Sequence, residues 1–122
     1  MKAESDQLKE EETYLEAPTI LKALIKLTAD KVQDKPTANR IGLPVSDINP
    51  VIRDEFGADC PTLLLSANQR NRILREDLGF QVKSANGKNR IYLTIPFLMI
   101  VCEENNVTDE VFAVWKEKLK AG

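Results

Sequence analysis

The sequence contains no histidine and only two cysteines, Cys60 and Cys102. Two cysteines alone cannot supply the ligands of a structural zinc site. The absence of an imidazole also excludes the serine, cysteine and metal mechanisms that depend on one. We therefore expect no catalytic residue, no metal site and no cofactor, and we expect both cysteines to be inert, reduced thiols.

Long apolar runs and glycine-rich phosphate loops are missing as well. No segment reaches the 18 apolar residues that suggest a membrane span, and residues 1–6 are too polar for a secretory signal. The chain has 122 residues, of which 43% are hydrophobic and 30% charged. This combination is typical of one soluble globular domain, which we expect in the cytoplasm and not at a membrane.

Charge is distributed unevenly around a net value of −2. Residues 1–16 carry two basic and six acidic side chains, whereas residues 70–90 carry six basic and two acidic ones. The total charge argues mildly against a nucleic-acid partner, but the local field governs binding more than the total does. The basic segment contains Arg70, Arg72, Arg75, Lys83, Lys88 and Arg90.

Apolar residues recur at helical spacing between positions 20 and 27, which predicts a core helix over about 19–32. The glutamate-rich residues 1–16 offer little to a core, so we expect an acidic tail or a loosely docked helix there. A single domain is expected to span residues 17–122. A short helical turn is expected at 37–41.

Two further helices follow in the expected order. The second begins after Ser46 or Asp47 and ends at Gly57. The third is capped by Thr62 or Ser66 and ends at Leu78-Gly79. The apolar positions assigned to these two helices are Ile48, Val51, Ile52, Phe56, Leu64, Leu65, Ile73, Leu74 and Leu78.

Asn86-Gly87 separates two segments that can extend, residues 81–85 and 88–95. This dipeptide is preferred in two-residue hairpin turns, because both central residues need positive φ. A β-hairpin is therefore expected here. It is followed by an apolar helix over 96–105 and a last helix over 108–120, and these two helices are candidates for a homodimer interface.

Residues 66–95 resemble the recognition helix and wing of winged helix-turn-helix domains. The helix ends in Leu78-Gly79-Phe80 and runs directly into a basic hairpin closed by Asn86-Gly87. The resemblance covers residues 45–95 approximately. It implies an α+β, mostly helical fold: a winged helix-turn-helix with a β-hairpin wing and extra C-terminal helices.

The same segment has the residue types of a DNA reader. Arginine pairs best with guanine and asparagine or glutamine with adenine, while basic side chains on a wing contact phosphates. We therefore expect a small, non-enzymatic protein that binds double-stranded DNA, either a transcriptional regulator or an accessory factor of a phage or plasmid. The expected DNA-binding residues are Asn68, Gln69, Arg70, Asn71, Arg72 and Arg75 on the helix, and Lys83, Lys88 and Arg90 on the hairpin.

Two alternatives remain open. Ala38, Gly42, Ile48 and Val51 have the spacing of an ordinary helix-turn-helix, which would present Ser46, Asp47, Asn49 and Arg53 to DNA; the acidic Asp54 and Glu55 make that face a poor polyanion surface. In the other alternative, the arginines pair with Glu76, Asp77 or the acidic N-terminal segment. The winged scaffold then binds a protein partner and no nucleic acid.

Overall fold

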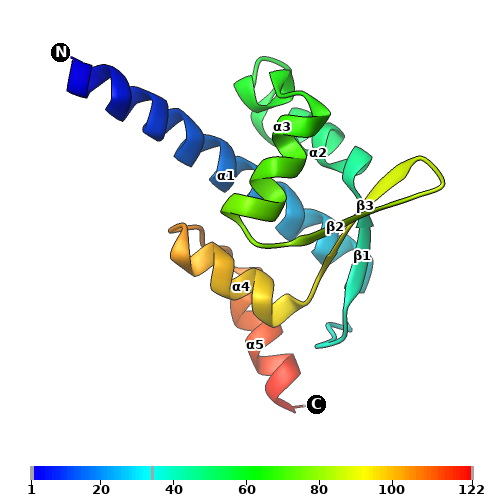
Figure 1. Ribbon diagram of the computed structural model, residues 1–122. Coiled ribbons are helices and arrows are strands. Elements are labelled where there is room, and N and C mark those ends of the chain that lie inside the picture. Colours follow the sequence, from blue (N-terminus) through cyan, green and yellow to red (C-terminus); the bar gives the residue numbers. More distant parts are fainter. Residues whose placement is uncertain (1, 34, 122) are drawn as a thin grey trace.

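The computed structural model describes the backbone of residues 2–33 and 35–121, and the side chains of residues 16–33, 35–84 and 86–120. Helices and one antiparallel sheet alternate along the chain (Figure 1). The α+β, mostly helical class is confirmed, with 62% helix. The main elements are α1 (Lys2–Val32), β1 (Ile41–Pro44), α2 (Ile48–Phe56), α3 (Ala67–Arg72), β2 (Gln81–Ala85), β3 (Lys88–Leu93), α4 (Ile95–Glu104) and α5 (Val111–Ala121).

The expected hairpin is confirmed. β2 and β3 pair antiparallel, with Ala85 opposite Lys88, and the two turn residues Asn86 and Gly87 have φ values of 54° and 78°. The hairpin projects from the body of the molecule (Figure 1). Its second strand ends at Leu93, earlier than expected, because the Thr94 hydroxyl accepts a hydrogen bond from Phe97 N–H and begins α4.

A third strand, β1, begins at Ile41, the last residue of the helical turn that the sequence suggested at 37–41. It pairs with the outer edge of β3, from Ile41 opposite Leu93 to Pro44 opposite Arg90, which gives the sheet order β1-β3-β2. Residues 37–40 are not helical either, so the helical turn was wrong throughout. The ordinary helix-turn-helix that needed Gly42 in a turn between two helices was wrong as well.

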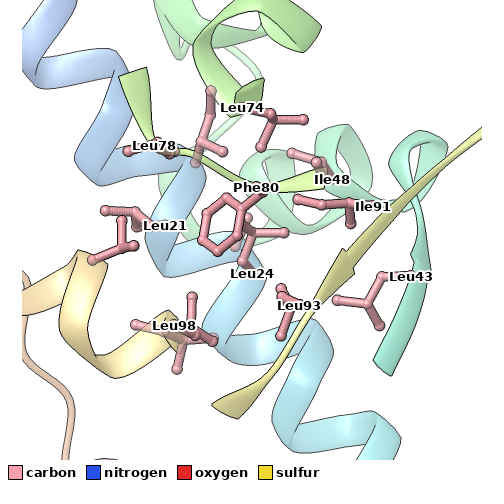
Figure 2. Packing of buried hydrophobic residues seen from close by; sticks show 14 of the residues in the cluster. Leu21, Leu24, Leu43, Ile48, Leu74, Leu78, Phe80, Ile91, Leu93 and Leu98 are labelled. Carbon is pink, nitrogen blue, oxygen red and sulfur yellow. The ribbon is translucent and has the colours of Figure 1, made fainter. Parts of the chain in front are cut away.

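The core lies between α1 and the inner face of the sheet. Leu21 and Leu24 of α1 are fully buried, as are Ile91 of β3 and Leu98 of α4, and Figure 2 shows their side chains converging with those of α3. The backbone of α1 is one continuous helix with Pro18 inside it. Residues 2–16 form its first part, which extends away from the body (Figure 1). The expected division between an N-terminal segment and a domain remains a prediction.

The third helix forms, but with an irregular second half. Ser66 and Gln69 make a capping box at its start, in which the Ser66 hydroxyl accepts from Gln69 N–H and the Gln69 side chain accepts from Ser66 N–H. After Arg72 the chain widens into one π-helical stretch, η3 (Ile73–Asp77). Leu64 was assigned wrongly: it ends the short 3₁₀ helix η2 (Pro61–Leu64) and is 86% exposed.

The two C-terminal helices close one end of the core. Trp115 of α5 is buried, and Phe97 of α4 packs edge-on against Phe80 with ring centroids 5.4 Å apart. At the start of α5 the side chain of Asp109 accepts a hydrogen bond from Val111 N–H. The expected cap, Thr108, is thus replaced by its neighbour.

The contrast between Leu74 and Leu64 gives a matched test of this packing. Leu74 is fully buried, so Leu74→Ala should lower the free energy of unfolding by about 2–5 kcal/mol, through lost burial and a residual cavity. Leu64→Ala removes an exposed side chain and should change it by no more than about 0.5 kcal/mol. Urea unfolding of both variants measures the difference, and equal losses would contradict the placement of α3.

Candidate nucleic-acid interface

Three exposed polar side chains lie on the outer side of the third helix: Asn68 and Arg72 of α3, and Arg75 of the π-helical η3 that continues it. Helical spacing gathers them on one side, while Ile73 and Leu74 face the core. Arg72 Nε donates a hydrogen bond of 2.8 Å to Glu76, one turn along. This hydrogen bond and the charge of Glu76 raise the pKa of the Arg72 guanidinium above its ordinary value. The ion pair that the protein-binding alternative anticipated between Arg72 and Glu76 is therefore present.

Two of the α3 side chains that were expected to contact DNA bases are not free to enter a DNA groove. The side chain of Gln69 is engaged in the capping box. Asn71 is only 9% exposed, and its Oδ1 is buried without a hydrogen-bond donor among the residues that the structure describes. The Gln69 amide is therefore committed to the start of α3, and Asn71 lies mostly inside the fold, so neither side chain is free to contact a base.

An open cleft of about 450 Å³ lies between α3 and the hairpin. Its hairpin wall is Asn89 of β3, a residue that the sequence did not single out. The position follows from the strand, because side chains two residues apart lie on the same face. Asn89 therefore shares with Ile91 and Leu93 the face of the hairpin that turns toward the core. The α3 wall of the cleft is formed by Asn68, Asn71, Arg72, Arg75 and Glu76.

The three cations of the hairpin occupy its opposite face. Lys83 lies directly across from Arg90 in the register, and Lys88 shares their side by alternation. All three are exposed. The residues expected to form one basic surface are thus divided. Arg72 and Arg75 border the α3 cleft, whereas Lys83, Lys88 and Arg90 lie on the outer face of the hairpin.

Arg40 extends the outer basic face, and the sequence analysis did not identify it. Its guanidinium lies 4.9 Å from the centroid of the Tyr92 ring, a cation–π distance. Tyr92 in turn lies across Gly42, where a Cβ atom would come within 3.1 Å of its ring. An arginine one position before a strand could have been found only by predicting β1.

The remaining expected cation, Arg70, points away from the α3 cleft. It is partly buried beside the start of α2 and the hairpin tip. Burial lowers the pKa of its guanidinium from the ordinary arginine value. Arg70 is therefore set apart, both in position and in environment, from Arg72 and Arg75.

Other surfaces offer less chemistry. Among the described residues, no group of three or more acidic or cysteine side chains is arranged to hold a metal ion. Within the same part of the chain, no helix has the length and apolar character needed to cross a membrane. A groove of about 550 Å³ between α4 and α5 includes Met99, Phe112 and the half-exposed Ile100. The homodimer through these helices remains a prediction.

Comparison of this chain with protein-family models, with curated proteins and with solved structures finds no match in any of the three.

The cysteines provide a chemical test of the inert role assigned to them. Cys102 is fully buried, and burial raises the pKa of its thiol to about 12. Because the thiolate is the reactive form, Cys102 should resist iodoacetamide in the folded protein from pH 7 to pH 9, and should react after unfolding. Mass spectrometry of the alkylated peptides measures this, and labelling of native Cys102 at the unfolded rate would contradict it.

Proposed function

We propose that this protein binds double-stranded DNA without catalysing a reaction, as a winged helix-turn-helix domain. The observation that carries the proposal is the cleft between α3 and the hairpin, where exposed Arg72 and Arg75 face Asn89 across open space. An α-helix fits the major groove, and arginine and asparagine are the side chains that best recognise guanine and adenine.

The order of elements supports the winged arrangement. α2 precedes α3, and the hairpin follows α3 directly, so that a helix pair and a projecting wing stand side by side (Figure 1). β1 adds to the edge of β3 and anchors the wing to the body. Such a frame holds a reading helix and a wing at a fixed relative position, which binding to a regular duplex requires.

The two basic faces suggest different tasks within this function. Arg72 and Arg75 border a cleft with asparagines, which suits contact with base edges. Three further cations, Lys83, Arg90 and Arg40, are exposed and do not line the α3 cleft, so they are suited to phosphates. A regulator of transcription or an accessory factor of a phage or plasmid would use both kinds of contact.

Salt dependence of DNA binding tests the proposal. Wild-type protein should bind a random duplex with a slope of log K against log salt of about −3 to −5, because counterions are released from the phosphates. Arg72→Ala/Arg75→Ala should weaken binding and flatten the slope by up to about 2. Fluorescence anisotropy at several salt concentrations measures both quantities.

The matched control for this double variant is Lys31→Ala/Arg53→Ala. It removes the same charge from exposed positions on α1 and α2, away from the cleft. Its slope should equal that of the wild type. If both double variants lost the same duplex affinity, total charge alone would explain the effect. If the wild type bound no duplex at low salt, the protein-binding alternative would be favoured.

Removing the charge of Glu76 is expected to raise duplex affinity, whereas removing Arg72 and Arg75 lowers it. The Glu76 carboxylate neutralises Arg72 and lines the cleft, so Glu76→Gln should strengthen duplex binding by about two- to fivefold at low salt. Glu104→Gln, an exposed change of the same charge on α4, serves as the control. The same anisotropy measurement compares them, and an equal gain in both variants would contradict a local role for Glu76.

A further inference from the structure

A second concavity lies on the other side of the hairpin base. β1 ends at Pro44, opposite Arg90, so Lys88 and Asn89 have no strand on that edge of β3. The chain turns there into the short 3₁₀ helix η1 (Val45–Asp47). The resulting open notch of about 460 Å³ is bounded by η1, the hairpin tip and Arg70.

The polar lining of the notch is dominated by positive charge. Arg70 comes from α3 and Lys88 and Arg90 both come from β3, and Ser46 adds a hydroxyl. Asp47 is the one carboxylate among its described lining residues. Several cations that line one concavity suit a ligand with several charged oxygens.

Arg70 is the unusual member of this set. Its Nε is buried and has no hydrogen-bond acceptor among the residues that the structure describes. Burying a cationic donor without an acceptor destabilises a folded protein, and burial accordingly lowers the pKa of this guanidinium. Arg70 lines the notch, so an anion bound there would bring a negative charge next to this partly buried guanidinium.

We propose that the notch is a phosphate-binding site in which the Arg70 guanidinium is the central donor. Lys88 and Arg90 complete the positive surroundings. In the DNA complex proposed above, on which this assignment rests, the ligand is one phosphate of the backbone. Asn89 lines both the notch and the α3 cleft, so the two concavities are neighbours on the surface. Arg70 thereby fixes the position of the duplex and reads no base.

Inorganic phosphate tests the site without DNA. At an ionic strength matched with chloride, phosphate well above its dissociation constant should raise the melting temperature of the wild type by a few degrees. Arg70→Met, which keeps most of the side-chain length, should abolish this rise. Asp47→Asn should enlarge it, since the opposing carboxylate is removed. Arg53→Met, an exposed arginine of α2, should leave it unchanged.

Stability separates a binding role from a structural one. If Arg70 serves a ligand, Arg70→Met in the absence of phosphate should melt at or above the wild-type temperature, because an unpaired buried donor is removed. A structural arginine would lower it. Arg70→Met should also bind duplex DNA about tenfold more weakly, as expected for the loss of a charged hydrogen bond.

The outcomes distinguish this assignment from the proposed function. An equal rise of the melting temperature in the wild type and in Arg70→Met overturns the notch as a phosphate site. If Arg70→Met binds duplex DNA normally while Arg72→Ala/Arg75→Ala does not, the proposed function holds and the backbone contact at the notch is wrong. A third outcome is that the wild type binds no duplex, is stabilised by phosphate, and that Arg70→Met is not stabilised by phosphate. In that case the site takes a free phosphate and the DNA proposal fails.

Discussion

Burial of one face of β3 is the constraint on which the rest of this structure depends. Ile91 and Leu93 are almost completely buried against α1, and Val82 of β2 joins them. A slip of one residue in the register would turn these side chains outward and the charged ones inward, so the hydrophobic pattern fixes the pairing. The same pairing sets the position of β1 and the direction in which the hairpin projects (Figure 1).

This constraint explains why one basic stretch of sequence forms more than one basic surface. Alternation along β3 sends Asn89 to the inner side and Lys88 and Arg90 to the outer side. On α3, a step of one residue separates Arg70 from Asn71 by about 100° around the helix axis, which directs Arg70 to the notch while Arg72 and Arg75 border the cleft. Charge density along the chain identifies the basic segment, and the periods of its helix and strands distribute its side chains over different faces.

The features that the sequence predicts well are those encoded by neighbouring residues. Asn86-Gly87 specifies its own turn, and Ser66 with Gln69 specifies its own cap, so the hairpin and the start of α3 were predictable. β1 has only four residues, two of which are Gly42 and Pro44, and it is a strand because β3 offers it an unpaired edge. The burial of Arg70 and the place of Arg40 beside Tyr92 depend on that same distant pairing, and no local pattern indicates them. Leu64 is a case in which a local pattern misleads. Its apolar side chain fits the pattern of the third helix, but the 3₁₀ helix at Pro61–Leu64 comes before that helix begins.

Each of the two concavities contains one acidic residue, Glu76 in the cleft and Asp47 in the notch. These carboxylates oppose any polyanion, and the net charge of −2 opposes it at longer range. A surface of this kind binds weakly to non-specific DNA, because its long-range electrostatic attraction to phosphates is small. In the DNA complex proposed above, affinity depends on several contacts made together: Arg72 and Arg75 in a groove, cations of the hairpin on the backbone, and a phosphate beside Arg70. In that complex, the acidic residues inside the basic surface favour discrimination between matched and unmatched sites over tight binding to every duplex.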